Sequence, residues 1–213
     1  MFCDCLPYDH SYTPSTSRVV MKPNAIDVFR DWFALALKDS PLQHPKAMCL
    51  STVNEDAIPE ARFVALKKVS DEGFVFCSSL ESPKALSIAT HSNVALTFWW
   101  DHIERQVRIR GQASQISDAD AEYYFHERRR DAQLTTLASQ QSTPLSSQAE
   151  LEESLRVIKK RYEGHQIPRP HTWGGYCVKP EKIEFLEFQK NRLHIRTLYI
   201  FSRGKWSKFL LQP

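Results

Sequence analysis

The feature that most constrains this fold is a series of short segments rich in β-branched and aromatic residues, each bounded by turn-forming residues. AMCLSTV, ARFVALKKV and GFVFCSS follow one another closely, separated by the polar turns NED and SDEG. NVALTFWW and ERQVRIRGQASQI continue the pattern, and WGGYCVKP, KIEFLEF, RLHIRTLYIFS and KWSKFLL end the chain. Such runs are typical of an antiparallel meander. We therefore expect a mainly β fold, an antiparallel closed or partly open barrel that carries helices.

A first helix is predicted from Ala25 to about Lys38. Four apolar residues recur there at helical spacing and give the helix one apolar face: Ile26, Phe29, Phe33 and Leu37. Asn24 can cap the first turn, where Asp27 also favours the helix dipole. This helix should pack on the core through its apolar face.

Three further helices interrupt the strand pattern. Ser82 and Pro83 are suited to the cap and first position of a helix over PKALSIATH. Ser117 with Asp120 resembles a capping box in front of AEYYFHERR. After the polar stretch SQQSTPLSSQ, an amphipathic pattern predicts a long helix over residues 149–162.

The 213 residues, 42% of them hydrophobic, are enough for one sizeable core. We expect a single domain over residues 24–213 with a helical insertion at about residues 117–163. Residues 1–23 are rich in proline, serine and threonine, which predicts a flexible or extended N-terminal arm.

The charge balance excludes several classes of partner. Lys and Arg total 28 against 25 Asp and Glu, which is too even for a nucleic-acid or membrane-surface protein. No apolar run is long enough to span a membrane, and the N-terminus lacks the pattern of a signal peptide. A cytoplasmic protein is expected. No GxGxxG or GxxxxGK loop is present, which argues against a Rossmann or P-loop site.

The five cysteines predict free thiols rather than disulfides or a metal site. Cys49, Cys77 and Cys177 lie in strand-like runs, where buried thiols are common. Cys3 and Cys5 have no second Cys or His pair at metal-binding spacing, so we assign no metal.

The segment RLHIR near the C-terminus is the most informative for chemistry. If it forms a regular strand, Arg192, His194 and Arg196 share one face, and Leu193 and Ile195 share the other. One interpretation is a solvated strand edge. The other is an anion-binding, proton-handling surface on which His194 is the group that titrates near neutral pH.

Two other pairs of residues could bind an anion. Arg62 and Lys67 in RFVALK lie on opposite faces of a regular strand, about 17 Å apart at roughly 3.3 Å per residue. They could mark the two ends of an elongated ligand or be two surface cations. Tyr124 and Arg128 are four residues apart on a predicted helix, so their side chains could converge on a phosphate or lie side by side by chance.

Taken together and in order, these motifs resemble the pyridoxine 5'-phosphate oxidase family. The matching pieces are RFVALK, FVFCSS followed by SPKA, ERQVRIRG, YYFHERRRDAQ, SQQS, WGGY, IEF and RLHIR, and they cover about residues 24–213. The resemblance implies an FMN-binding split β-barrel that forms a homodimer, with one FMN at each cleft between subunits. It also implies oxidation of pyridoxine or pyridoxamine 5'-phosphate to pyridoxal 5'-phosphate with O2 as acceptor.

The resemblance also implies roles for individual residues. Those matching FMN contacts are Arg62, Phe63, Val64, Ala65, Leu66, Lys67, Cys77, Ser78, Lys84, Gln106, Gln141, Ser142 and Arg196. Those matching substrate contacts are Lys67, Tyr124, Arg128, Arg192 and His194. Arg192 and His194 would be catalytic, orienting the substrate for hydride transfer from its C4' to flavin N5 and assisting proton movement.

Four positions depart from the family pattern. Pro83 stands where the family has Arg, Leu186 where it has Trp, Ala132 where it has Ser, and Ile195 where it has Asp. Residues 1–23 do not match the family's substrate-covering segment. Two alternatives therefore stay open: a related FMN oxidase of the phenazine-biosynthesis type, and a non-catalytic protein that binds flavin or pyridoxal phosphate.

Overall fold

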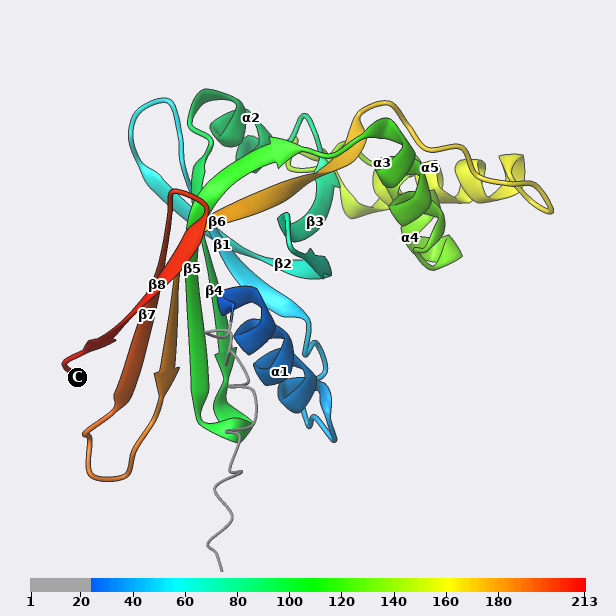
Figure 1. The fold of residues 1–213 in the computed structure, drawn as a ribbon. Helices are drawn as coiled ribbons and strands as arrows, with labels where there is room; N and C mark the ends of the chain where they lie inside the picture. Colours follow the sequence, from blue (N-terminus) through cyan, green and yellow to red (C-terminus); the bar gives the residue numbers. More distant parts are fainter. Residues whose placement is uncertain (1–23) are drawn as a thin grey trace, which may run out of the picture.

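The structure is a computed structural model that describes residues 24–213 (Figure 1). The predicted N-terminal arm, with Cys3 and Cys5, lies outside the described residues. The strands are β1 (Ala47–Val53), β2 (Pro59–Ser70), β3 (Gly73–Ser79), β4 (Asn93–Trp100), β5 (Arg105–Gln115), β6 (Trp173–Glu187), β7 (Ile195–Ser202) and β8 (Lys205–Leu211). The helices are α1 (Ala25–Leu37), α2 (Pro83–Thr90), the 3-10 turn η1 (Asp101–Ile103), α3 (Asp118–His126), α4 (Arg130–Ala138) and α5 (Gln148–Arg161).

The eight strands form one antiparallel sheet that closes on itself. Neighbouring strands run in the order β3-β2-β1-β4-β5-β6-β7-β8, and an additional pairing of β3 with β6 closes the first six into a barrel. Phe76 of β3 lies opposite Tyr176 of β6 at this seam. Gly175 allows the two strands to approach, since a Cβ there would lie 2.5 Å from the carbonyl oxygen of Phe76. The predicted antiparallel barrel is confirmed.

The barrel interior is filled by apolar side chains from the strands and from α1. Phe29 of α1 is fully buried, with ring centroids 4.8 Å from Phe74 and 5.0 Å from Phe98. The predicted cap is confirmed, because the Asn24 side-chain oxygen accepts a hydrogen bond from the backbone N–H of Ile26 at 3.0 Å. Capping and an apolar face therefore place α1 on the barrel core as expected.

A second apolar cluster joins the later helices to the outside of the barrel. Val75 and Trp173 of the β3–β6 seam pack against Phe125 of α3 and Leu134 of α4. Figure 1 shows α3, α4 and α5 together at this side, and β7 and β8 on the opposite side of the barrel. Among the described residues, no helix has both the length and the apolar character needed to cross a membrane.

The helical region differs from the expected pattern at one point. Ser117 caps α3 as predicted, because its Oγ accepts from the Asp120 N–H at 3.1 Å and donates to the Asp120 carboxylate. The helix predicted to continue through Arg129 ends at His126, however, and a separate helix starts at Arg130. The Gln133 amide donates to the carbonyls of His126 and Arg128, which stabilises this break.

Candidate active site

One large cavity lies where β2 and β3 meet the start of α2, α4 and the segment that follows α4. Its volume is about 1030 Å³, within the range expected of a small-molecule site. No cluster of three or more His, Cys, Asp or Glu residues that could hold a metal ion occurs in residues 24–213. Cationic and hydroxyl side chains line much of the cavity, together with Glu60, Glu81 and Cys77.

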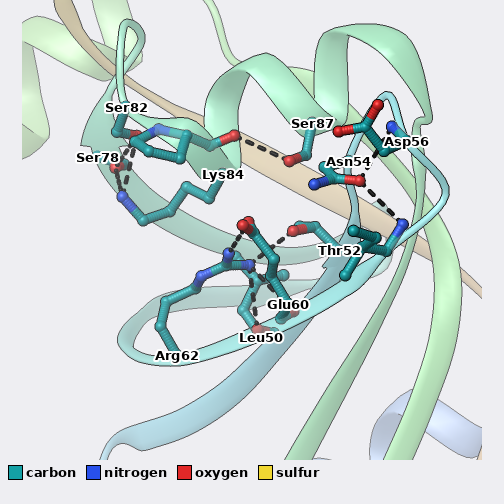
Figure 2. Close-up of polar contacts among 12 residues, drawn as sticks. Leu50, Thr52, Asn54, Asp56, Glu60, Arg62, Ser78, Ser82, Lys84 and Ser87 are labelled. Atoms are coloured by element: carbon teal, nitrogen blue, oxygen red, sulfur yellow. Dashed lines mark hydrogen bonds and ion pairs between the residues drawn. The ribbon is translucent and has the colours of Figure 1, made fainter. Parts of the chain in front are cut away.

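Lys84 provides a buried positive charge at one end of the cavity. Its side chain is only 7% exposed, and Nζ donates hydrogen bonds to Ser78 Oγ at 2.8 Å and Ser82 Oγ at 2.9 Å (Figure 2). No carboxylate pairs with Lys84 in the described part of the chain. Burial, together with the nearby charge of Arg62, lowers the pKa of Lys84 from 10.5 to about 8. A buried ammonium with only hydroxyl partners is suited to an anionic ligand.

Ser82 is the N-cap residue of α2 as predicted, and Lys84 explains the role of its hydroxyl. Ser82 precedes α2 and Pro83 is its first residue, as predicted, but the Ser82 hydroxyl makes no capping hydrogen bond. It accepts from Lys84 and donates to the carbonyl oxygen of Ser79 at 2.8 Å. The serine therefore stabilises the lysine rather than the helix terminus.

Arg62 on β2 lies beside Lys84 in the same cavity (Figure 2). One terminal nitrogen, Nη1, donates to Thr52 Oγ1 at 2.7 Å, and the other, Nη2, forms a 2.8 Å ion pair with Glu60. Strand β2 brings Glu60 and Arg62 to the same side because the two residues are two positions apart. The two cations and the Ser78 hydroxyl can together bind the oxygens of a phosphate group.

A second cationic region lies farther along the cavity, at Lys67 and Arg128. The Arg128 guanidinium stacks on Trp173, with 5.1 Å to the ring centroid, and donates to Thr136 Oγ1 at 2.6 Å. Burial lowers the pKa of Arg128 but leaves it charged. The Cys77 thiol lies close to both cations, yet burial dominates and raises its pKa to about 11. Cys77 is therefore a neutral thiol in the cavity wall.

Most of the residues expected to contact flavin line this one cavity. These are Arg62, Phe63, Val64, Ala65, Lys67, Cys77, Ser78, Lys84, Gln141 and Ser142. Leu66, in the same stretch of β2, instead points into the barrel core and is 2% exposed. Cys49, Cys77 and Cys177 are free and partly buried, as expected of structural thiols.

Tyr124 and Arg128 do not share a helix face. Because α3 ends at His126, Arg128 lies beyond the helix and lines the large cavity, whereas Tyr124 lines an adjacent one of about 330 Å³. Tyr124 is 8% exposed, and burial raises the pKa of its hydroxyl. The prediction that this pair shares one helix face was therefore wrong.

Several cavity residues were not found from the sequence. They are Glu60, Ser79, Glu81, Thr135, Thr136, Ser139, Gln140, Thr172 and Trp173. Thr135 and Thr136 belong to α4, the helix that the sequence pattern did not reveal, and Ser139 follows it. Glu60 could have been found, because it lies two positions before Arg62 on the same strand.

The C-terminal cations lie outside the cavity, and their predicted arrangement was wrong. Strand β7 begins only at Ile195, and Arg192 has a left-handed backbone with φ of 64°. Arg192 and His194 are therefore in the turn before β7 and do not alternate with Arg196 on one strand face. The His194 Nδ1 accepts a hydrogen bond from the Gln189 N–H at 3.0 Å.

Gln106 and Arg196 lie in one row across three strands. In the strand register Gln106 is opposite Leu186, and Leu186 is opposite Arg196. Arg196 forms a 2.7 Å ion pair with Glu184, which is also 3.4 Å from Arg108. Strand β7, which carries Arg196, lies on the side of the barrel away from α3–α5 (Figure 1). Within one chain, the residues expected to bind flavin thus form two separate groups.

Comparison with known families gives the context for this arrangement. Residues 37–164 match the model of the pyridoxamine 5'-phosphate oxidase family, and this match covers more than half of the chain. The chain belongs to this family. Residues 173–213 match the pyridoxine 5'-phosphate oxidase C-terminal dimerisation region, which includes β6, β7 and β8.

Relatives of the pyridoxamine 5'-phosphate oxidase family match almost the whole chain. The pyridoxine/pyridoxamine 5'-phosphate oxidase of Rubrobacter xylanophilus is 43% identical over 191 residues, which are 90% of this chain and 88% of that protein. The protein of the same name from Thermosynechococcus vestitus is 44% identical over 188 residues, 88% of each chain.

The solved structures agree with this fold. PhzG from Burkholderia lata 383, in complex with tetrahydrophenazine-1-carboxylic acid, superposes with a TM-score of 0.83 at 26% identity, covering 88% of this chain and 92% of that one. A pyridoxamine 5'-phosphate oxidase-related FMN-binding protein from Nostoc punctiforme has a TM-score of 0.73 at 16% identity, covering 91% and 100% of the two chains. The second similarity shows the fold alone.

Proposed function

We propose that this protein is an FMN-dependent oxidase that converts pyridoxine or pyridoxamine 5'-phosphate to pyridoxal 5'-phosphate with O2 as acceptor. The observation that carries the proposal is a single cavity with two cationic ends, one at Lys84 and Arg62 and the other at Arg128 and Lys67. A phosphorylated cofactor and a phosphorylated substrate together require two such ends. Family membership gives the reaction class.

The first end fits the phosphate of FMN. Lys84 would offset one charge of the phosphate dianion, while Arg62 and the Ser78 hydroxyl would complete its hydrogen bonds. The Gln141 side-chain oxygen accepts from the Ser79 N–H at 3.2 Å, which fixes Gln141 in the cavity wall near the flavin. When bound, FMN supplies the hydride acceptor. The motifs that resemble the family include nothing for an adenine half, so FMN should be preferred over FAD.

The second end fits the phosphate of the substrate. Arg128 has no carboxylate partner within residues 24–213, and its stacking on Trp173 leaves part of its hydrogen-bond fork available. Thr136 orients the guanidinium through its hydroxyl, and Lys67 adds a second positive charge. These groups would hold the substrate by its phosphate and place the reacting carbon toward the middle of the cavity.

The remaining residues are proposed to come from a second copy. The family's dimerisation region covers β7 and β8, where Leu210 is 75% exposed, and the turn before β7 exposes Leu193 at 66%. In a homodimer that buries these side chains, each cavity would receive the partner's Gln106 and Arg196 toward flavin. Arg192 and His194 of the partner subunit would orient the reacting end of the substrate and assist proton movement.

Titration of the purified protein with FMN, followed by an assay with pyridoxine 5'-phosphate, tests the proposal. We expect quenching of FMN fluorescence at a stoichiometry of one per chain, a dimer near twice 24.7 kDa in light scattering, and oxygen-dependent formation of pyridoxal 5'-phosphate. Absence of FMN binding at micromolar concentrations would refute the cofactor. FMN binding without turnover would identify a non-catalytic flavin-binding protein.

A second candidate is a phenazine-type oxidase, which the PhzG structure with its tetrahydrophenazine ligand favours. The two substrates differ in the group that the second cationic end would bind, a phosphate in one and a carboxylate in the other. The same assay with a dihydrophenazine carboxylic acid distinguishes them. Faster turnover of that compound than of pyridoxine 5'-phosphate would assign the second activity.

A further inference from the structure

The Arg62 guanidinium already has an anionic partner inside the cavity. Glu60 Oε2 lies 2.8 Å from Arg62 Nη2, and both residues line the cavity that also contains Lys84 (Figure 2). The side chain of Glu60 is 37% exposed and that of Arg62 is 22% exposed. This carboxylate therefore occupies a donor position that an incoming phosphate would otherwise use.

Glu60 is not required to hold Arg62 in place. Arg62 Nη1 is anchored separately by Thr52 Oγ1 at 2.7 Å and, more weakly, by the backbone carbonyls of Leu50 and Glu60. The only side-chain hydrogen bond of Glu60 in the described chain is the one to Arg62. The Nε–H of Arg62 has no hydrogen-bond partner in residues 24–213, so the guanidinium can still donate to a ligand.

The net charge at this end of the cavity also indicates that Glu60 opposes phosphate binding. Lys84 and Arg62 contribute two positive charges, and the carboxylate of Glu60 offsets one of them. Position 83, next to Lys84, is a proline and contributes no charge. Phosphate binding must therefore proceed against the carboxylate, either by displacing Glu60 from Arg62 or by sharing the guanidinium with it.

We propose that Glu60 is an internal counter-anion of Arg62 that lowers the affinity of this subsite for the phosphate of FMN. The inference rests on the proposed function, because it takes FMN phosphate as the ligand of Lys84 and Arg62. Its consequence is that the phosphate contributes less to FMN binding than two cations would allow. FMN should then exchange more readily with free cofactor than in a variant without the carboxylate.

Flavin titrations of wild type and Glu60→Gln test this role. Glutamine keeps the size of the side chain and removes its charge, so FMN should bind about fivefold or more tightly. Riboflavin, which lacks the phosphate, should bind both proteins equally. Glu81→Gln is the matched control, because Glu81 also lines the cavity but pairs with no cation among the described residues; its FMN affinity should change by less than about twofold.

Each outcome separates this inference from the proposed function. If wild type binds FMN and Glu60→Gln binds it equally or more weakly, Glu60 supports the site and the inference is overturned while FMN binding stands. Equal tightening in Glu81→Gln would also overturn it, because bulk charge would then explain the effect. If neither protein binds FMN, both proposals fail. Should Glu60→Gln not fold, Glu60→Ser removes the carboxylate with a smaller side chain and must give the same tightening.

Discussion

Substitution of Lys84 by methionine should have opposite effects on stability and on FMN binding. Lys84 is 7% exposed, and its pKa is lowered from 10.5 to about 8. Lys84 therefore binds its proton less strongly in the folded protein than in the unfolded chain. At pH 7 this difference destabilises the folded state by about 3 kcal/mol. Methionine fills a similar volume without the charge and removes this cost.

The gain is reduced by two lost hydrogen bonds. Lys84 donates to Ser78 and Ser82, and each bond contributes about 1 kcal/mol. Both hydroxyls keep other contacts, since Ser82 donates to the Ser79 carbonyl and Ser78 lies 3.4 Å from the Gln141 side-chain oxygen. The flavin-free variant should therefore be about 1 kcal/mol more stable than wild type at pH 7, which raises Tm by roughly 2–4 °C.

The sign of the pH dependence follows from the direction of the pKa change. Because the pKa of Lys84 is depressed in the folded state, the destabilisation of the folded protein by charged Lys84 is fully present below pH 8. It disappears as pH rises from about 8 to 10.5. In wild type this group makes the protein more stable with rising pH across that window. FMN affinity should fall over the same rise, because neutral Lys84 no longer attracts phosphate. The methionine variant should show neither contribution.

Thermal unfolding of the flavin-free proteins and fluorescence titration with FMN measure the two effects. FMN binding by Lys84→Met should weaken by about 2 kcal/mol, roughly thirtyfold, through loss of a charge-assisted contact. Riboflavin is the control ligand and should bind unchanged. A variant that is less stable at pH 7 and binds FMN as tightly as wild type would refute the assignment of Lys84 to an anion site.

Other substitutions test the core, the dimer and the C-terminal residues. Phe29→Ala should destabilise the protein by about 3–5 kcal/mol in denaturant unfolding, and a loss below 1 kcal/mol would contradict its place in the barrel core. Leu210→Glu should shift the mass measured by light scattering toward that of a monomer and should also weaken FMN binding. If the variant stays a dimer, β8 does not contribute to the interface. Arg196→Ala should loosen FMN, whereas Arg192→Ala should keep FMN and lower kcat/KM by about 2 kcal/mol. Wild-type rates in Arg192→Ala would leave that residue without a role in catalysis.

The sequence predicted elements well where local chemistry determines them. Asn24 and Ser117 cap helices as expected, because each side-chain oxygen accepts a hydrogen bond from a backbone N–H in the first turn of its helix. Ser82 has the same local pattern, but its hydroxyl binds Lys84, a contact that no rule about caps includes. The break at His126 was also missed, because it depends on the Gln133 amide reaching back across the turn.

The candidate site was only partly predictable from the alternation of side chains along strands. On β2, Leu66 lies in the core and Lys67 in the cavity, but the period of two does not select the site residues, because the strand is irregular between Leu66 and Lys68 and residues of both faces line the cavity. At RLHIR the same rule failed, because a left-handed residue, Arg192, ends the regular pattern before the strand begins. The roles of Arg192 and His194 came from family resemblance, and they stay predictions because one chain does not bring them to the cavity.

The structure shows what surrounds Ala132 on α4, one of the departures from the family pattern. Ala132 removes a hydroxyl expected near the substrate phosphate, but Thr136 lies one helical turn later on α4 and lines the cavity. The Thr136 hydroxyl accepts from Arg128 and donates to the Ala132 carbonyl at 2.9 Å, so it is fixed beside the guanidinium that would bind the phosphate. Because its proton is donated to the Ala132 carbonyl, the Thr136 hydroxyl does not replace the missing serine as a donor to the ligand. We therefore expect selectivity between a phosphate and a carboxylate to depend on Arg128, which Thr136 orients and whose remaining N–H groups the ligand would meet.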